Sequence, residues 1–392
     1  MGVPSFITLV LVVVIMFHSF FVEPTCSSSS PSPSPSSYYP PPYKAVRAAY
    51  WPGGSDFSPS SINTNYFSHI YYAFLLPQPD SYNLDVTQSD QTQIPIFING
   101  LRSLNPPVNT LLSIGGGGSN SSVFSAMAST ATTRAAFINS TIQVARQYGF
   151  DGLDLDWEFP NTVQDMSNLA LLFKEWYQAL VSDAKLRRKP RLLLTAAVYY
   201  ANRIVFLGNE PRSYPAEAIR NYLDWASPMC FDYHGAWDNF TGVNAALYDP
   251  KSNISTHYGL GSWIQAGVPP SKLVMGLALY GRTWKLDDPS VHGLGAPAHG
   301  AATDTDGTMD YDEILKFNTQ NGATVVYDGL SVSFYSYAGT TWITYDDVWS
   351  IRMKAHFARS LALRGYFFWA VDKDKDWALS RQASSTWGHG RY

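Results

Sequence analysis

The sequence repeats one pattern, in which a short apolar run typical of a β-strand is followed by a longer stretch with helical spacing of apolar residues. Eight such runs begin near Ala45, His69, Val108, Gly152, Arg191, Ser227, Leu273 and Arg364. Between two of them, Leu169, Phe173, Trp176 and Leu180 fall on one helical face. This alternation predicts an α/β fold, a (β/α)8 TIM barrel with a closed parallel sheet and helices outside it.

The interval between the seventh and eighth runs is by far the longest. It contains residues 323–337, ATVVYDGLSVSFYSY, which alternate between apolar and polar side chains as an antiparallel strand does. We therefore expect a small α+β insertion at residues 283–345, between strand 7 and helix 7 of the barrel. The barrel domain as a whole is expected over residues 44–392. With 45% hydrophobic residues, the chain can bury a large core, which excludes global disorder.

The first 43 residues resemble export and linker segments. Residues 6–22 are apolar and precede small and polar residues, which predicts a signal peptide at 1–26. No Lys or Arg precedes this run, so a signal anchor is the alternative. Residues 27–43 are rich in Pro and Ser and predict an extended linker. We expect a secreted, extracellular protein with no membrane contact after signal cleavage.

Charge and cysteine content narrow the classes of partner. The net charge of −4, from 27 Lys+Arg against 31 Asp+Glu, excludes a polybasic surface, so no nucleic acid is expected. Cys26 lies in the expected cleavage zone and Cys230 in an apolar run, so the mature chain should lack a disulfide. Asn-x-Ser/Thr sequons stand at Asn120, Asn139, Asn239 and Asn253, and secretion would make the protein a glycoprotein. We expect a monomer.

The stretch DGLDLDWE at residues 151–158 is the most informative motif. On a strand, Asp154, Asp156 and Glu158 (the acidic triplet) share one face, and the intervening Leu, Leu and Trp share the other. The apolar face can pack against helices, so the acids face the barrel axis, with Glu158 at the C-terminal rim where barrel active sites lie. Three carboxylates in a confined space cannot all ionise cheaply, so the pKa of at least one rises.

This stretch has two alternative interpretations. An exposed acidic strand would explain the alternation, but it would not explain the Asp151-Gly pair that begins the motif. A metal site is the second alternative, yet no His stands nearby to support it. We therefore expect acid–base chemistry with no metal and no cofactor.

The stretch resembles the DxxDxDxE signature of family 18 glycoside hydrolases, the chitinases. Further segments match family motifs in the family's order: Ser113-Ile-Gly-Gly for SxGG, Met229-Cys-Phe-Asp232 for M-x-Y-D, Tyr280-Gly-Arg282 for YGR, and Trp369 for the tryptophan of strand eight. The resemblance covers about residues 44–390, and the layout is most similar to plant class V chitinases.

The resemblance implies retaining hydrolysis of β-1,4-N-acetylglucosamine linkages in chitin or chitooligosaccharides, with the substrate's N-acetyl oxygen as nucleophile. It implies that Glu158 protonates the glycosidic oxygen and then activates water. Asp156 would hold the acetamide N–H and share a proton with Asp154, while Trp369 would lie beneath the −1 sugar. The other implied sugar contacts are Tyr50, Phe74, Met229, Asp232, Tyr280 and Arg282, with Ser113 in support. Core packing alone is the alternative role for Trp369 and for these sugar contacts.

One position departs from the family pattern. The family tyrosine before Asp232, whose hydroxyl donates a hydrogen bond to the acetamide oxygen, is Phe231 here. Losing one such donor can cost about 10²–10³-fold in rate. Tyr233 has the same strand parity and is the candidate substitute. Two functions follow: a chitinase with activity reduced by Phe231, or a low-activity chitinase-like lectin or chitooligosaccharide-binding protein. The acidic triplet favours the enzyme, and Phe231 favours the binding protein.

Overall fold

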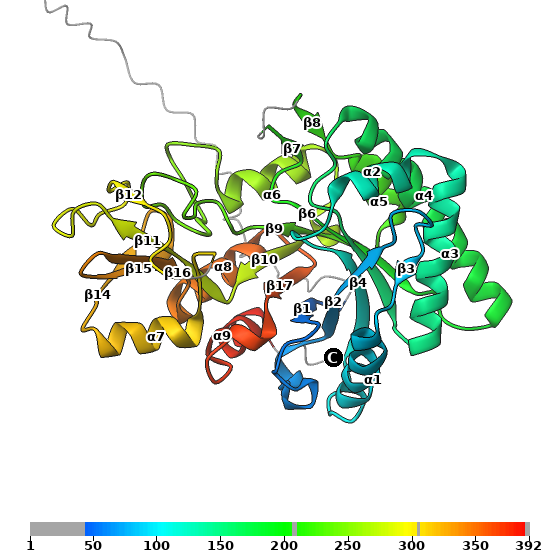
Figure 1. Cartoon of the computed structure of the whole chain (residues 1–392), viewed down its shortest axis with the longest axis horizontal. Coiled ribbons are helices and arrows are strands. Elements are labelled where there is room, and N and C mark those ends of the chain that lie inside the picture. Colours follow the sequence, from blue (N-terminus) through cyan, green and yellow to red (C-terminus); the bar gives the residue numbers. More distant parts are fainter. Residues whose placement is uncertain (1–43, 206–209, 304–305, 389–392) are drawn as a thin grey trace, which may run out of the picture. The chain divides into compact units, whose positions relative to one another are not determined.

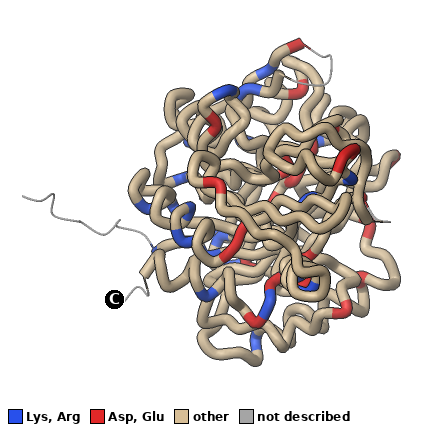
Figure 2. The backbone as a smooth tube through the Cα atoms, turned by 90° about the vertical axis from the view of Figure 1, so that its left-hand side faces the viewer, with Lys and Arg blue, Asp and Glu red and all other residues tan. Residues whose placement is uncertain are grey.

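The computed structural model describes residues 44–205, 210–303 and 306–388 (Figure 1). The expected signal peptide and linker lie outside these residues. Within the described part, no helix is long and apolar enough to span a bilayer. Figure 2 shows acidic and basic residues separated by long uncharged stretches of chain, as expected when 15% of residues are charged.

Eight parallel strands form the main sheet: β1 (Val46–Pro52), β2 (His69–Pro77), β4 (Asn109–Gly115), β5 (Gly152–Asp156), β6 (Leu193–Tyr199), β9 (Trp225–Met229), β10 (Val274–Ala278) and β17 (Gly365–Trp369). They pair in the order β10-β17-β1-β2-β4-β5-β6-β9, and a bridge between Ala226 and Leu273 joins the two ends. Each strand begins within two residues of its predicted start. The predicted TIM barrel is therefore confirmed.

Helices surround the strands (Figure 1). They are α1 (Gln88–Arg102), α2 (Ser121–Ser129), α3 (Ala131–Tyr148), α4 (Val163–Arg187), α5 (Ala216–Tyr222), α6 (Thr256–Gln265), α7 (Tyr311–Gln320), α8 (Val348–Ser360) and α9 (Ala378–Trp387). Short 3₁₀ turns cover Pro59–Ser61, Thr64–Tyr66, Pro270–Lys272 and Val371–Lys373. The predicted face of α4 is buried at all four positions, and Trp176 packs edge-on against Phe137 of α3 with ring centroids 5.1 Å apart.

A second, antiparallel sheet lies between β10 and α8 in the chain. It consists of β11 (Tyr280–Leu286), β12 (Ala298–His299), β13 (Thr308–Asp310), β14 (Thr324–Asp328), β15 (Ser333–Ala338) and β16 (Thr341–Tyr345). Its core is a small cluster in which the Trp284 and Trp342 rings lie 5.4 Å apart. Because β11 begins two residues after β10 ends, this sheet starts at the rim of the barrel. Short β3 (Leu84–Asp85) pairs with β2, and β7 (Arg203–Ile204) pairs with β8 (Arg212–Ser213).

The register of β4, β5 and β6 determines what surrounds the acidic triplet. Ser113 of β4 and Thr195 of β6 lie beside Asp154, so hydroxyl groups flank this carboxyl from both sides. At the next inward-facing position of β5, Gly115 and Ala197 lie beside Asp156. Gly115 has φ +123°, and a Cβ there would lie 1.9 Å from the carbonyl oxygen of Asp156, so only glycine allows this close approach.

Candidate active site

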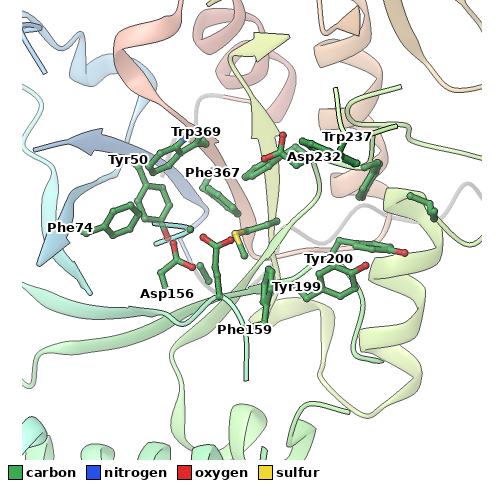
Figure 3. Close-up of a pocket in the computed structure, with 17 residues that line it drawn as sticks. Tyr50, Phe74, Asp156, Phe159, Tyr199, Tyr200, Asp232, Trp237, Phe367 and Trp369 are labelled. Atoms are coloured by element: carbon green, nitrogen blue, oxygen red, sulfur yellow. The ribbon is translucent and has the colours of Figure 1, made fainter. Parts of the chain in front are cut away.

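A cavity of about 610 Å³ lies where the barrel strands end at their carboxyl side (Figure 3). Asp156 and Glu158 line it, whereas Asp154 lies buried below it. Aromatic side chains are the largest group in its lining: Tyr50, Phe74, Phe159, Tyr199, Tyr200, Phe231, Tyr233, Trp237, Phe367 and Trp369. Three carboxyl groups, those of Asp156, Glu158 and Asp232, in a mainly aromatic cleft suit a ligand with apolar faces and a bond that needs acid–base help.

Asp154 is held by hydroxyl donors. The Tyr50 hydroxyl donates to it at 2.9 Å, Ser113 at 2.7 Å and Thr195 at 2.5 Å, so both carboxylate oxygens accept hydrogen bonds. Burial raises the pKa of Asp154, and the three hydroxyl donors oppose part of that rise. These hydrogen bonds therefore hold the Asp154 carboxyl group in one position below Asp156.

Asp156 has a different environment. Because its strand neighbours are glycine and alanine, no hydroxyl reaches it from either side, and its Oδ1 is buried without a hydrogen-bond partner among the described residues. Burial, followed by the charges of Glu158 and Asp154, raises the pKa of Asp156 well above its usual range. These effects favour the protonated form of Asp156, and its Oδ1 is available to a ligand.

Glu158 lies two residues beyond the end of β5 and lines the cavity. Burial, followed by the negative charge of Asp232, raises the pKa of Glu158 to about 7. A carboxyl group with this pKa is protonated in a large fraction of molecules near neutrality, as a general acid must be.

Ser121, the first residue of α2, contacts the residues on either side of Glu158. Its Oγ donates to the carbonyl oxygen of Phe159 at 2.8 Å and accepts from the indole Nε1 of Trp157 at 2.8 Å. The buried Arg212 donates to the carbonyl two residues after Glu158. The Trp157 side chain before Glu158 and the backbone carbonyls of Phe159 and Pro160 after it are therefore tied to neighbouring elements. Sequence reasoning missed Ser121, although the polar Nε1 of a tryptophan on the helix-facing side of β5 does require some acceptor.

Aromatic residues from several strands form the wall of the cleft. Trp369 stacks on Phe74 with ring centroids 5.5 Å apart and lies 5.6 Å from Tyr50. Trp237 is 58% exposed and also lines the cavity, with the Arg282 guanidinium 5.0 Å from its ring centroid. The sequence did not single out Trp237, because it lies in a loop without strand or helix periodicity.

The remaining expected sugar contacts fall into two groups. Met229 and Asp232 line the cavity, as Tyr50 does. Arg282 pairs with the Asp232 carboxylate at 2.7 Å, and Tyr280 is buried in the cluster inside the barrel, so neither belongs to the cavity lining. The structure thus gives Arg282 and Tyr280 positions behind the wall, in contact with lining residues.

Phe231 and Tyr233 both line the cavity. The Phe231 ring packs against Tyr280 and Phe367, with centroids 6.2 and 5.9 Å away. The Tyr233 hydroxyl lies 3.0 Å from Oγ1 of Thr256, at the start of α6. The candidate substitute for the family tyrosine therefore already has a protein partner for its hydroxyl group.

Two further observations concern cysteines and metals. Cys230 is buried as a free thiol, whereas Cys26 lies outside the described residues. In the part of the chain that the structure describes, no cluster of three His, Cys, Asp or Glu side chains is arranged to hold a metal ion.

Sequence comparisons identify relatives along most of the chain. It is 66% identical over 345 residues to Class V chitinase CHIT5a of Medicago truncatula, covering 88% of this chain and 90% of that protein. It is 61% identical over 391 residues to Class V chitinase CHIT5 of Lotus japonicus, covering 99% and 96%. It is 48% identical over 347 residues to Nod factor hydrolase protein 1 of Medicago truncatula, covering 87% and 90%.

Solved structures of proteins with similar sequences have the same fold. A class V chitinase variant from Nicotiana tobaccum in complex with NAG4 has a TM-score of 0.85 at 38% identity, covering 88% of this chain and 99% of that one. The chitinase-like agglutinin from Robinia pseudoacacia has a TM-score of 0.81 at 40% identity, covering 88% and 100%. The family described as Glycosyl hydrolases family 18 matches residues 46–374. The chain therefore belongs to glycosyl hydrolase family 18.

Proposed function

We propose that the chain hydrolyses β-1,4-N-acetylglucosamine linkages in chitin or chitooligosaccharides by substrate-assisted retention. The observation that carries this proposal is that one cavity contains both Asp156, whose buried Oδ1 has no hydrogen-bond partner in the described part of the chain, and Glu158, whose pKa is raised to about 7. A protein that only bound sugar would have no need of a general acid with this pKa.

The roles of the acidic triplet follow from its partners. Glu158 protonates the glycosidic oxygen as the bond to the anomeric carbon breaks, and afterwards takes a proton from the attacking water. Asp156 accepts the acetamide N–H with Oδ1, which turns the acetamide oxygen toward the anomeric carbon. Movement of the Asp156 proton toward Asp154 then leaves a carboxylate that stabilises the oxazolinium intermediate.

The aromatic wall accounts for substrate positioning. Trp369 and Phe74, which stack on each other, line the cavity together with the exposed ring of Trp237 (Figure 3). Apolar ring faces pack well against the C–H faces of a pyranose, while carboxyl and hydroxyl groups bind its edges. Asp232 and its partner Arg282 fix the wall next to Glu158.

The second candidate is a chitooligosaccharide-binding protein with little turnover. Phe231 favours it, because the acetamide oxygen would lack the hydroxyl donor of the family tyrosine, and Tyr233 has its hydroxyl at Thr256. The same fold is found in a protein described as a chitinase-like agglutinin, which is a lectin-type name. The same cavity would bind the sugar in either case.

We also propose that the protein is secreted, glycosylated and monomeric, with a signal peptide at 1–26, a linker at 27–43 and the catalytic barrel from residue 44. The apolar run at residues 6–22 and the four sequons support export. N-terminal sequencing of secreted protein tests the cleavage site, and size-exclusion chromatography with light scattering tests the monomer.

The deciding experiment is an assay of the purified protein on N-acetylglucosamine oligomers, with product anomers followed by NMR. Hydrolysis with the β-anomer formed first is expected, because attack by the acetamide and then by water gives two inversions. Early α-anomer would contradict retention. Tight oligomer binding without hydrolysis would support the binding protein instead.

A further inference from the structure

A second cavity, of about 530 Å³, lies apart from the catalytic one. The segment between β9 and α6 forms most of it, and His257 and Tyr258 of α6 together with Gly329 and Leu330 of the turn between β14 and β15 complete it. Asn253 is among the residues that line this groove. Asn253 is also the acceptor position of the sequon Asn253-Ile254-Ser255.

We propose that this groove holds the first sugars of an N-linked glycan attached to Asn253. The proposal rests on entry of the chain into the secretory pathway and is independent of the hydrolase activity. The linkage forms when the Asn253 amide nitrogen replaces the lipid pyrophosphate leaving group of a preassembled oligosaccharide donor, with loss of one N–H proton.

The side chains of the groove suit a covalently held sugar. Tyr248 and Tyr258 are each 40% exposed, and Leu330 is 70% exposed, so three large apolar side chains are open to solvent in one groove. The face of a pyranose would cover such rings. Asp249 adds a carboxylate, whose Oδ1 accepts from the Lys251 N–H at 2.8 Å and whose Oδ2 accepts from the Ser252 hydroxyl. Each carboxylate oxygen has a second lone pair that a sugar hydroxyl can use.

The sequon is fixed between the two cavities. Ile254 lines the catalytic cavity, and the Tyr200 hydroxyl, from the same cavity, donates to the Asn253 carbonyl at 3.0 Å. Ser255 is buried and its Oγ accepts from the Tyr258 N–H at the start of α6. The sequon hydroxyl is therefore inaccessible in the folded protein, so the sugar must be attached before this segment folds and is then packed into the groove.

Asn139 provides a contrast within the same chain. It lies exposed on α3 and lines neither of the two cavities. A glycan there would project into solvent, whereas one at Asn253 would pack against protein. The two sites should therefore differ in how readily a glycosidase reaches the linkage of the native protein.

The test uses the full chain secreted from a eukaryotic host and glycopeptide mass spectrometry. We expect Asn253 to be occupied, and peptide N-glycosidase to release its glycan at least about tenfold more slowly from native than from denatured protein, since 1.4 kcal/mol of packing corresponds to a factor of ten. Tyr258→Ala and, as an independent change, Leu330→Ser should speed native release. Tyr327→Ala is the control, because Tyr327 is 38% exposed and lies outside the groove.

An unmodified Asn253 peptide from the secreted chain would overturn the proposal. Equal release rates from native and denatured protein would also overturn it, as would native release that neither groove variant changes. Hydrolysis of N-acetylglucosamine oligomers is measured on the same preparation. Failure of the proposed catalytic function would appear there and leave the glycan result unaffected.

Discussion

Asp154 and Asp156 occupy successive inward positions of β5, yet only Asp154 is surrounded by hydroxyl donors. Tyr50, Ser113 and Thr195 all donate to Asp154, whereas Asp156 has glycine and alanine beside it. The donors favour the ionised form of Asp154 and Asp156 lacks them, so the hydrogen bonds favour a shared proton on Asp156 over one on Asp154. In the proposed mechanism, this asymmetry lets Asp156 change its protonation state during the reaction.

The first prediction tests this asymmetry. Thr195→Val removes one donor to Asp154 at nearly constant volume, so the proton should shift toward Asp154. A hydrogen bond to a charged group is worth about 1.5–3 kcal/mol, and we expect kcat to fall roughly 10- to 150-fold with a small change in KM. Steady-state kinetics on N-acetylglucosamine oligomers measures both parameters. A change in KM alone would show that Thr195 serves packing only.

The second prediction concerns Glu158→Gln, which keeps the shape but carries no transferable proton. Turnover should fall by at least about 10²-fold, the lower end for general acid–base help, while oligomer affinity measured by calorimetry stays within a few-fold. Retention of more than about a tenth of the wild-type rate would remove Glu158 from the acid–base role.

The same carboxyl group affects stability. Because the pKa of Glu158 is raised from 4.5 to about 7, the folded state binds its proton more tightly than the unfolded state does. The free energy of unfolding should therefore fall as pH rises from about 4.5 to about 7. In Glu158→Gln this contribution disappears, which thermal melts across that pH range can show.

The third prediction concerns the pH dependence of catalysis. Since Glu158 must be protonated to act as the acid, kcat/KM should decline above about pH 7. Asp232→Asn removes the charge that helps raise this pKa, so the decline should begin at lower pH. Asp306→Asn is the matched control, because Asp306 also lies near Arg282, at 3.8 Å, but is 69% exposed. Equal shifts in both variants would contradict the assigned cause.

The fourth prediction concerns Ser121, which acts as a positioning residue for Glu158. Ser121→Ala loses the contacts to Trp157 and Phe159, and a displacement of about 1 Å at the acid can cost up to about 10²-fold in kcat. Ser121→Thr keeps the hydroxyl and should restore most of the rate. Ser129→Ala, at the other end of α2, should leave kcat unchanged. A matching loss in Ser121→Ala and Ser129→Ala would point to general destabilisation of α2.

The barrel and the acidic triplet could be predicted because both depend on strand periodicity. The alternation of acid and apolar residues from Asp154 to Glu158 fixes which side chains face the barrel interior, wherever the strand lies in the sheet. Family 18 membership, inferred from the motifs, is confirmed by the match over residues 46–374.

The contacts around the triplet could not be predicted in the same way. Ser121 reaches Trp157 and Phe159 only because α2 packs beside the end of β5, and nothing local to Ser121 encodes that distance. Thr195 is paired with Asp154 across β5 and β6, but the sequence alone does not predict this contact. The register between the two strands is set by the whole barrel. The partner of Tyr233 likewise comes from a helix 23 residues away in sequence.

The last prediction concerns Phe231, where the family has a tyrosine. Its ring lies in the cavity wall, against Phe367 and Tyr280. A Cβ added at Gly276 would lie 2.9 Å from Cε1 of this ring, which is the nearest side-chain atom. Phe231→Tyr adds one hydroxyl at the tip of this ring.

If the missing hydroxyl limits turnover, Phe231→Tyr should raise kcat roughly 10- to 150-fold, with affinity for oligomers barely changed. The new donor would bond the acetamide oxygen as that oxygen attacks the anomeric carbon, so the interaction strengthens at the transition state, on the scale of about 1.5–3 kcal/mol for a charge-bearing group. Kinetics of the two forms, beside Tyr233→Phe, provides the measurement. A rate that is unchanged in Phe231→Tyr but lost in Tyr233→Phe would assign the donor role to Tyr233, despite its contact with Thr256. Absence of turnover in both Phe231 forms, with binding intact, would make this chain a sugar-binding member of its family.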